Sequence, residues 1–361
     1  MTNTTVKKQT FCKGLLSAAA LGLMIATPAM SETYNLTMAS SHPTVLPWVG
    51  QLSTTVVAKS NERLEAMGSA DRIEWTETYG GALYGFKDTL EAVGDGLTDA
   101  GWVGTLWEGS KMPLQNITYF TPFVSDDLVE TLKIMNTLHR EMPELQAAWE
   151  DQNVVFLGAS GVETYHLFTN FPVNSLADLD GRKIIAPGPS ANWIKSVGAV
   201  PVNGALPTYY NQIQTGVADG VVVIITGAFP NKHYEVAPYV TLVGLGAQMT
   251  GGLGINKDVW DGLSDDVRAV LTELGEEYTV AHAEEVMARY DNFLAKLPEV
   301  GATVSELPAA DIQAWVDGLP NLAQDWVDAN AADGAGAVLN AYMDKVKAAN
   351  LETRIDWSAR E

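Results

Sequence analysis

Cysteine is nearly absent from this 361-residue chain, in which Cys12 is the only one. A lone thiol cannot close an intramolecular disulfide, and it cannot supply the paired thiolate ligands of a structural zinc site. Cys12 also lies ahead of an apolar N-terminal run, so removal of that segment would leave no thiol. Thiol-based nucleophilic catalysis is therefore excluded for a chain processed in this way.

Positive charge is scarce as well. The chain has 22 lysine and arginine residues against 44 aspartate and glutamate residues, and its formal net charge is −22. A surface of this sign repels the phosphate backbone of DNA and RNA, so we expect no nucleic-acid partner. The same charge would keep an exported protein soluble.

The sequence also lacks the short motifs of common catalytic and metal sites. It contains no H-E-x-x-H, no G-x-S-x-G and no phosphate-binding P-loop. No two histidines are at metal-ligand spacing. The five histidines are His42, His139, His166, His233 and His282. We therefore expect a protein that is not an enzyme and needs no metal or cofactor.

A three-part pattern opens the chain. Lysines precede an apolar run over residues 14–26, and small residues follow at 29–31. This pattern is typical of a secretory signal, so we predict a signal peptide over residues 1–31 and a mature chain from near Glu32. The apolar run is shorter than the roughly 20 residues that span a membrane. We expect the mature chain to be exported.

Strand and helix patterns alternate through the first part of the mature chain. Alternating residues predict strands over 34–39 and 73–79, and helical spacing predicts a helix over 48–67 between them. A short helix over 88–93 and a buried strand over 100–103 follow. This βαβαβ order predicts a parallel sheet, with ligand-facing loops at the carboxyl ends of its strands.

A second unit is expected to open with the apolar strand that begins at Val154 and to continue to Ile225. The chain then returns to the first unit with a strand over 251–256 and a long helix over 264–288, for which Ser264 is the predicted N-cap. Two units joined by more than one crossing segment predict a hinge, with a small-molecule cleft between the units.

Short motifs in a fixed order carry a resemblance over nearly the whole chain. They are Asp88-Thr-Leu-Glu-Ala-Val93 with Gly96, Asp99-Ala-Gly101, Pro122-Phe123, Gly198-Ala-Val-Pro-Val202, Thr215-Gly-Val-Ala-Asp-Gly220 and Tyr234-Glu-Val236. This order resembles that of the solute receptors of TRAP transporters, of the DctP type. We therefore expect an extracytoplasmic receptor that takes up a solute for transport.

The resemblance implies an α/β fold: a two-lobe periplasmic binding protein with a hinge and an interlobe cleft. Lobe I is expected over residues 32–155 plus about 250–290, and lobe II with the C-terminal helices over 156–249 plus about 291–361. In this family the lobes close on one small-molecule ligand. The closed receptor then docks on a permease made of a small and a large membrane subunit.

Two positions depart from the family pattern. Most members have the sequence Lys-Ile-Arg where this chain has Lys183-Ile184-Ile185. The arginine that binds the substrate carboxylate in those members is therefore replaced by Ile185. His166, after Tyr165, stands where many relatives have a second arginine. Loss of two bidentate carboxylate donors disfavours a C4-dicarboxylate as ligand.

The candidate ligand-binding residues lie on loops and strand ends expected at the cleft. His42 follows a strand and can donate a hydrogen bond to a carboxylate. Trp102 and Trp107 flank a strand end and could stack on an apolar, aromatic or cationic ligand, although core packing would account for one of them. The full set is His42, Trp48, Glu77, Tyr79, Trp102, Trp107, Glu108, Tyr165, His166, Ile185, Asn192, Tyr209, Thr226 and Phe229.

Several functions remain open at this point. The first is a receptor for a small monocarboxylate with an apolar or aromatic body, held by His42, Asn192, His166 or backbone donors. The second is a receptor for a small amine or other cation, held by Glu108 or Glu77 and a tryptophan face. The third is an exported acid/base enzyme using His42 and the two glutamates. A sensor in place of a transport receptor is a further alternative.

Overall fold

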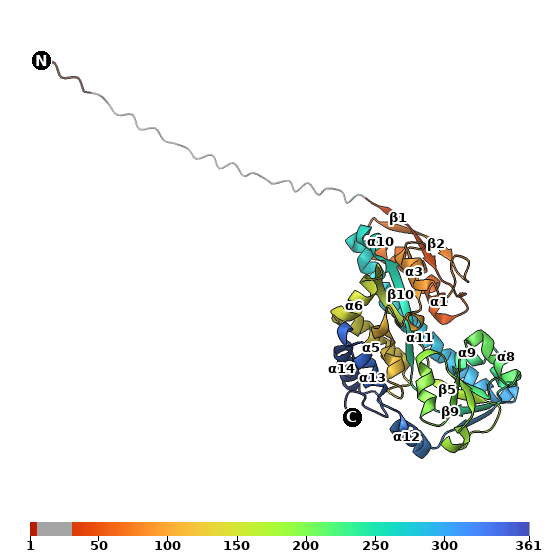
Figure 1. The fold of residues 1–361 in the computed structure, drawn as a ribbon. Coiled ribbons are helices and arrows are strands. Elements are labelled where there is room, and N and C mark those ends of the chain that lie inside the picture. The colour runs from red at the N-terminus through yellow and green to blue at the C-terminus, as the bar shows by residue number, and fades with distance from the viewer. Residues whose placement is uncertain (6–30, 361) are drawn as a thin grey trace.

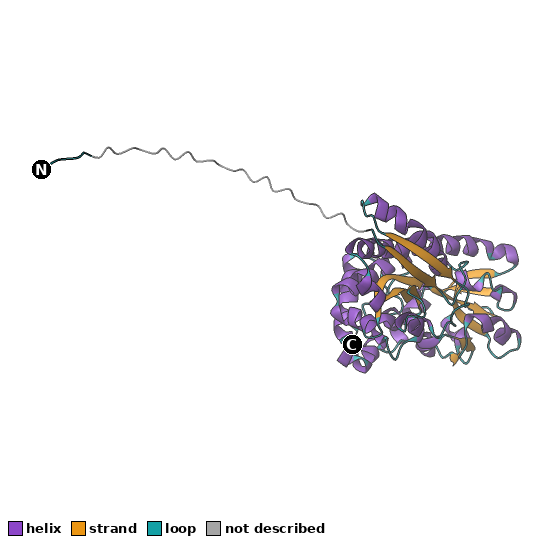
Figure 2. Ribbon diagram, turned by 90° about the horizontal axis from the view of Figure 1, so that it is seen from above, coloured by secondary structure: helices purple, strands orange, loops and turns teal. Residues whose placement is uncertain are grey.

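The computed structural model describes residues 1–5 and 31–360. Two lobes lie one beside the other, with β1, β2 and β10 in one and β5, β9 and α8 in the other (Figure 1). Strands run through the middle of the molecule and helices surround them (Figure 2). Most of the predicted signal peptide, including Cys12, lies outside the described residues. Within the described part, no helix is long and apolar enough to cross a membrane.

The sheet of the first lobe has five strands in the order β2-β1-β3-β10-β4. They are β1 (Thr33–Ala39), β2 (Arg72–Thr78), β3 (Ala100–Val103), β4 (Val154–Val162) and β10 (Gln248–Asn256). β1 is parallel to β2 and β3, as the sequence predicts, but β10 is antiparallel to both β3 and β4. The sheet is therefore mixed, and the expectation that the strand from Val154 opens the second unit is wrong. That strand stays in the first sheet because it pairs with β10 along its whole length.

Helices cover this sheet. They are α1 (Pro47–Gln51), α2 (Ala58–Ala66), α3 (Thr89–Gly94), α4 (Ile117–Phe120), α5 (Leu128–Glu141), α6 (Pro143–Glu150) and α10 (Lys257–Gly262). A π-helical turn over Leu52–Val57 joins α1 to α2, so the helix predicted over 48–67 is present with one irregular turn. Asp127 caps α5 by accepting a hydrogen bond from the backbone N–H of Glu130 at 3.0 Å.

The sheet of the second lobe has six strands in the order β11-β9-β5-β8-β6-β7. They are β5 (Tyr165–Thr169), β6 (Lys183–Ile185), β7 (Val200–Val202), β8 (Gly220–Ile224), β9 (Tyr239–Leu242) and β11 (Thr303–Glu306). Its helices are α7 (Ala191–Lys195), α8 (Tyr209–Gln214), α9 (Ile225–Ala228) and α12 (Ala309–Gly318). β6 is parallel to both β7 and β8, so the loops after these three strands leave the same edge of the sheet.

One long helix, α11 (Asp265–Lys296), contacts β4 and α5 in the first lobe and α9 in the second. Ser264 is its N-cap, as predicted, because its hydroxyl accepts a hydrogen bond from Val267 N–H. The helix lies unusually close to β4 at Gly275, where an added Cβ would stand 2.2 Å from the carbonyl oxygen of Leu157. Only glycine permits this approach of the two backbones.

The lobes are also joined by the 163–164 segment between β4 and β5 and by the 243–247 segment between β9 and β10. The C-terminal helices α13 (Leu322–Ala329) and α14 (Ala335–Ala348) pack on α4 and α5. Residues 291–361 are therefore divided: β11 and α12 belong to the second lobe, whereas α13 and α14 lie against the first. The apolar surface of α5 explains this placement, since α14 buries part of it.

Candidate ligand-binding site

A cavity of about 780 Å³ lies between the two lobes. Its walls come from loops and strand ends of both sheets, as expected for a two-lobe binding fold. The first lobe contributes His42, Leu46, Trp48, Phe86, Lys87, Trp102, Leu106, Trp107, Val162 and Thr250. The second contributes Tyr165, Pro187, Gly188, Asn203, Gly204, Ala205, Leu206, Pro207, Thr208, Tyr209, Val223 and Ile224. This volume suits one small organic molecule.

Aromatic rings form the wall on the first lobe. The rings of His42 and Trp102 meet edge to face at 5.3 Å, and those of Trp48 and Trp102 lie 6.2 Å apart. Trp107 follows at 6.1 Å from Trp102 and is half exposed. The indole N–H of Trp102 donates to Ser160 Oγ at 2.7 Å, which fixes the ring. The wall thus offers aromatic faces and edges to a ligand.

The wall on the second lobe combines Tyr165 and Tyr209 with the loop over residues 203–208. The hydroxyl of Tyr165 pairs with that of Tyr119 at 3.0 Å, and burial raises the pKa of Tyr165, so both phenols are neutral. Residues 203–208 follow β7 and bring Asn203 and Thr208 to the cavity. This placement follows from the parallel strands, whose carboxyl ends face the cleft.

Charge in the cavity is sparse. Lys87 is the one lysine or arginine on its wall among the residues described. His42 also lines the cavity, and burial lowers the pKa of its ring below the usual value of 6.5, so the ring is neutral at pH 7. Its Nδ1 pairs with Ser41 Oγ at 2.9 Å. The cavity wall therefore includes one basic residue, Lys87, and neutral hydrogen-bonding groups.

Six of the residues proposed from the sequence line this cavity. They are His42, Trp48, Trp102, Trp107, Tyr165 and Tyr209. The others lie outside its wall, each for an identifiable structural reason. They are Glu77, Tyr79, Glu108, His166, Ile185, Asn192, Thr226 and Phe229.

His166 is a hinge residue in this structure. Its Nδ1 accepts hydrogen bonds from the backbone N–H groups of Val243 and Gly244 at 3.1 and 3.3 Å, and its Nε2 pairs with the hydroxyl of Tyr290 at 2.9 Å. Burial lowers the pKa of His166 to about 3, which keeps the ring neutral. The side chain ties β5 to the 243–247 crossing and α11, so its donors and acceptors are already used.

Ile185 and Asn192 are placed behind and beside the cavity. Ile185 is fully buried in β6, and an added Cβ on the lining residue Gly204 would stand 3.0 Å from its Cγ2. It therefore supports the wall from the layer behind. Asn192, on α7, accepts a hydrogen bond from Lys195 Nζ at 3.1 Å through its Oδ1. That pairing directs the amide toward an exposed side chain.

The two glutamates proposed for a cation lie apart from the cavity wall. Glu77 is exposed near the end of β2 and accepts a hydrogen bond from the hydroxyl of Tyr79 at 2.8 Å. Glu108 is buried; burial, and then the nearby carboxylate of Glu91, raise its pKa. Neither carboxylate is presented to a solute in the cavity.

Thr226 and Phe229 belong to the packing around α9. The backbone N–H and the hydroxyl of Thr226 both donate to the Glu163 carboxylate. Phe229 stacks on Phe293 of α11 with ring centroids 4.7 Å apart. Both residues therefore connect the second lobe to the hinge region and the long helix.

Sequence reasoning missed several wall residues, above all Lys87 and the 203–208 segment. Each carried a usable signal. Lys87 and Phe86 follow the Gly80-Gly81 break after a strand, on the same edge as His42. The 203–208 segment comes directly after β7, and loops at the carboxyl ends of parallel strands are where ligands bind in such sheets.

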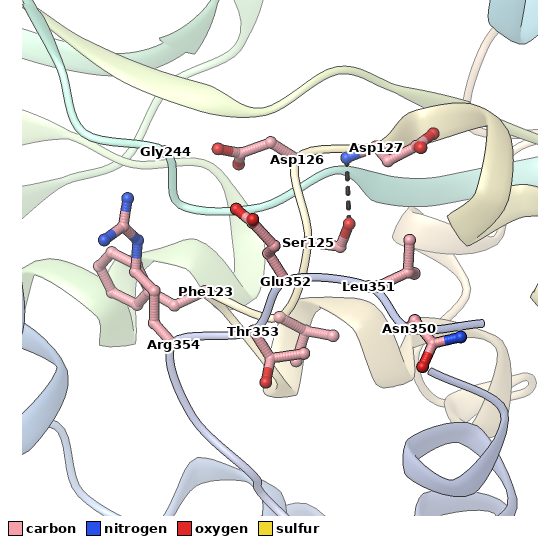
Figure 3. A pocket seen from close by; sticks show the side chains of 11 residues that line it. Phe123, Ser125, Asp126, Asp127, Gly244, Asn350, Leu351, Glu352, Thr353 and Arg354 are labelled. Carbon is pink, nitrogen blue, oxygen red and sulfur yellow. Dashed lines mark hydrogen bonds between the residues drawn. The ribbon is translucent and has the colours of Figure 1, made fainter. Parts of the chain in front are cut away.

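A second cavity, of about 700 Å³, lies at the crossing between the lobes. Figure 3 shows the side chains of Asp126, Glu352 and Arg354 around it, next to Gly244. Three lining residues have left-handed backbones: Phe123 at φ 64°, Asn350 at 53° and Gly244 at 70°. Its rim is polar and rich in carboxylates, so it suits an apolar organic anion less well than the aromatic cavity does. No group of three metal-ligating side chains occurs in the described part of the chain.

Comparison with known proteins decides the family. The model of the bacterial extracellular solute-binding proteins, family 7 (DctP), matches residues 53–329. The chain belongs to this family. The resemblance to TRAP receptors predicted from the sequence is thereby confirmed. Proteins of this family are extracytoplasmic solute receptors that work with membrane permeases.

Relatives of the receptor are distant in sequence. It is 31% identical over 166 residues to a solute-binding protein of Sulfitobacter sp. strain NAS-14.1, an alignment that spans 45% of this chain and 50% of that relative. It is 23% identical over 254 residues to the ectoine-binding periplasmic protein TeaA of Halomonas elongata, covering 68% of this chain and 72% of TeaA.

The receptor's fold matches a solved structure closely. A TRAP periplasmic solute-binding protein from Sulfitobacter sp. NAS-14.1 with bound β-D-galacturonate superimposes with a TM-score of 0.68 at 22% identity, covering 85% of this chain and 99% of that one. The predicted two-lobe α/β fold is confirmed by this match.

Proposed function

We propose that this receptor binds a small organic monocarboxylate with an apolar or aromatic body and delivers it to a TRAP permease of one small and one large membrane subunit. The observation that carries the proposal is the composition of the interlobe cavity. Its walls are mostly aromatic and aliphatic, and Lys87 is the single lysine or arginine that lines them within the described residues. One cation neutralises one carboxylate, and the aromatic wall accommodates the remainder of the solute.

A dicarboxylate fits this cavity less well. Two carboxylates in a low-dielectric cleft each require a cation or several strong donors, because burying an unpaired charge is costly. Arginine, which binds carboxylates through two parallel hydrogen bonds, does not line the cavity in the part of the chain described. Ile185 and His166, at the two positions where the family resemblance leads us to expect arginine, add no charge to it.

The ligands named for two relatives support a carboxylic acid as the solute, and one of them also carries a positive charge. Galacturonate, bound in the Sulfitobacter structure, carries a single carboxylate. Ectoine, named as the ligand of TeaA, combines a carboxylate with a cationic ring. The cationic part of a zwitterion could rest on the tryptophan faces while Lys87 holds the acid. A zwitterionic monocarboxylate is therefore included in the proposed class.

A receptor for a simple amine is the second candidate. The tryptophan wall favours it, since indole faces attract cations. Lys87 opposes it, and Glu77 and Glu108, the expected counter-ions, lie off the cavity wall. An exported acid/base enzyme is opposed by the same geometry, because a proton-transfer group must reach the substrate and both carboxylates lie outside the cavity.

Thermal unfolding of the purified receptor against matched solutes tests the proposal. Phenylacetate and phenethylamine share a benzyl body and differ in the sign of their charge; succinate, galacturonate and ectoine extend the comparison. A ligand that binds only the folded state raises the unfolding temperature. We expect a rise with phenylacetate or ectoine and none with phenethylamine or succinate. A rise with galacturonate alone would contradict the apolar or aromatic body of the proposed solute. A rise with phenethylamine alone would replace the proposal by the amine receptor.

The same mixtures distinguish a receptor from an enzyme. After overnight incubation with a solute that raises the unfolding temperature, the protein is denatured and the released compound is identified by mass spectrometry. Recovery of the unchanged compound in stoichiometric amount is expected of a receptor. Conversion that scales with protein concentration would favour the enzyme.

A further inference from the structure

Gly104 lies between two tryptophan rings of the cavity wall. It follows β3 directly, and both Trp102 and Trp107 line the interlobe cavity. A Cβ atom added to Gly104 would stand 2.8 Å from Cη2 of Trp102, and 2.8 and 2.9 Å from Cε3 and Cζ3 of Trp107. Carbon atoms in favourable contact are about 3.5–4.0 Å apart, so the two rings leave no room for a side chain at this position.

The need for glycine is a matter of space and not of backbone conformation. Gly104 has φ −90° and ψ 82°. Its φ is negative and close to that of an inverse γ-turn, a conformation that residues with a side chain adopt. Alanine could therefore take this backbone conformation, and only the neighbouring rings oppose its methyl group.

The backbone of Gly104 is held on its other sides. Its N–H donates to Thr89 Oγ1 at 3.0 Å. β10 also passes close by, since a Cβ atom added to Gly251 would stand 3.1 Å from the Cα of Gly104. A methyl group at position 104 must therefore displace a ring, because the backbone has no space into which to withdraw.

The two rings differ in their freedom to move. Trp102 is 2% exposed, and its indole N–H donates to Ser160 Oγ at 2.7 Å. Trp107 is 48% exposed, so part of its surface is free of protein contacts. Trp107 is therefore the ring that a side chain at position 104 would displace.

Trp107 belongs to an exposed aromatic pair on the wall. Its ring meets that of Phe86 edge to face at 5.7 Å and that of Trp102 at 6.1 Å. Phe86 also lines the cavity and is 39% exposed. Among the described residues of this wall, Trp107 and Phe86 are the aromatic side chains with more than a third of their surface exposed. An apolar solute that covers them removes this surface from water.

We infer that Gly104 is a positioning residue of the solute site. Because it has no side chain, Trp107 lies against Trp102 and offers, together with Phe86, a fixed aromatic surface to the solute. Gly104 is not itself part of the cavity wall, so it acts through Trp107. The inference rests on the proposed function in taking the interlobe cavity as the solute site. It narrows the solute class to acids with a flat ring, which covers more of an aromatic surface than a puckered ring does.

The first test measures thermal unfolding of the receptor without solute. It compares Gly104→Ala, Trp107→Leu and the double variant, with Gly109→Ala as control, because a Cβ atom at Gly109 meets nothing closer than 3.8 Å. We expect Gly104→Ala to lower the unfolding temperature of the native protein and to lower that of Trp107→Leu clearly less, since the displaced ring is then absent. Gly109→Ala should have little effect.

Two outcomes of this test would overturn the inference. Equal falls in the native and Trp107→Leu backgrounds would show that Gly104 acts on Trp102 or on the backbone. If Gly104→Ala alone does not fold, the double variant is expected to fold because Trp107 no longer opposes the methyl group. A double variant that also fails to fold would assign Gly104 a role that does not pass through Trp107.

The second test measures affinity by calorimetry for phenylacetate and cyclohexylacetate, which share a carboxylate and differ in having a flat or a puckered ring. We expect the native receptor and Gly109→Ala to prefer phenylacetate. Gly104→Ala should weaken phenylacetate binding by about threefold to tenfold, the size expected for one aromatic contact, and reduce the preference. The double variant should bind no more weakly than Trp107→Leu. A preference that survives Gly104→Ala, or a native receptor without one, would overturn the inference.

The two proposals fail in different ways. If phenylacetate, cyclohexylacetate and ectoine all fail to bind the native receptor, the proposed function fails, while the unfolding comparison still decides whether Gly104 holds Trp107. Binding of ectoine alone would keep the proposed function and overturn the flat-ring solute of this inference.

Discussion

The buried carboxylate of Glu163 accepts two hydrogen bonds from Thr226, at 2.7 Å from the backbone N–H and at 2.8 Å from the hydroxyl. Glu163 lies in the short segment between β4 of the first lobe and β5 of the second, and Thr226 is in the first turn of α9. The pair therefore joins a hinge segment to a helix of the second lobe. Complete burial of Glu163 outweighs these hydrogen bonds and raises its pKa from 4.5 to about 7.

This raised pKa predicts a pH dependence of stability. The folded state holds the proton more tightly than the unfolded state, so the contribution of Glu163 is fully present below pH 4.5 and is lost as the pH rises through about 7. Glu163→Gln mimics the protonated form. We expect the variant to unfold at a higher temperature than the native protein at pH 8 and at a similar temperature at pH 5. Glu62→Gln, at an exposed position of α2, is the control. A parallel pH profile for native protein and Glu163→Gln would contradict the prediction.

Gly275 predicts a second effect on stability. Alanine at this position places its Cβ against the carbonyl oxygen of Leu157, so α11 must move away from β4. We expect Gly275→Ala to lower the unfolding free energy by about 1–3 kcal/mol or more, as overpacking does. Gly262→Ala on α10 meets nothing within 4 Å and should be neutral or slightly stabilising. Urea unfolding measures both, and equal midpoints for the two variants would show that the helix accommodates the methyl group.

Lys87 predicts a charge-dependent change in affinity. Lys87→Met keeps much of the side-chain length and removes the ammonium group. We expect binding of a monocarboxylate such as phenylacetate to weaken by about tenfold, and the salt dependence of its affinity to diminish, because an exposed cation is screened by ions. Lys195→Met, on an exposed part of α7 outside the cavity, should leave the affinity unchanged. Calorimetry at two salt concentrations distinguishes these outcomes. If Lys87→Met binds the monocarboxylate with unchanged affinity, Lys87 does not take part in solute binding.

The C-terminal segment predicts a fourth effect. The Arg360 guanidinium donates to the carbonyl oxygens of Val316 at 2.9 Å and Asp317 at 3.1 Å, near the end of α12, and lies 5.0 Å from the Trp357 ring. We expect Arg360→Ala to lower the unfolding free energy by about 1–3 kcal/mol, since the last carbonyls of the helix lose their donors. Arg354→Ala, at an exposed side chain of the same segment, is the matched control. If both variants lose the same unfolding free energy, the effect comes from removing a positive charge and not from the hydrogen bonds of Arg360.

The order of elements followed from local sequence. Helical spacing over 48–67 and alternation over 73–79 predicted α1–α2 and β2, and Ser264 marked the start of α11 correctly. These signals are local, because side-chain periodicity and capping depend on residues within a few positions. The motif order was likewise sufficient to identify the family.

The pairing of the strands could not be predicted from the sequence to the same extent. The apolar residue pattern of the strand from Val154 is compatible with a place in either sheet. Its partner is β10, almost a hundred residues later, and that pairing depends on where α11 and the crossing segments place β10. Long-range pairing of this kind is not encoded in local periodicity.

The sequence by itself determined the family of this protein and the type of most elements, and it singled out four rings that the structure places on the wall of the interlobe cavity, those of His42, Trp48, Trp102 and Tyr209. Only the tertiary structure decided which polar groups face the cavity. His166 and Thr226 are turned to hinge contacts, while Lys87, from a loop without a distinctive motif, reaches the wall. The reason is that a binding site is assembled from strand ends far apart in sequence, and each side chain's hydrogen-bond partners are fixed only when the lobes pack together.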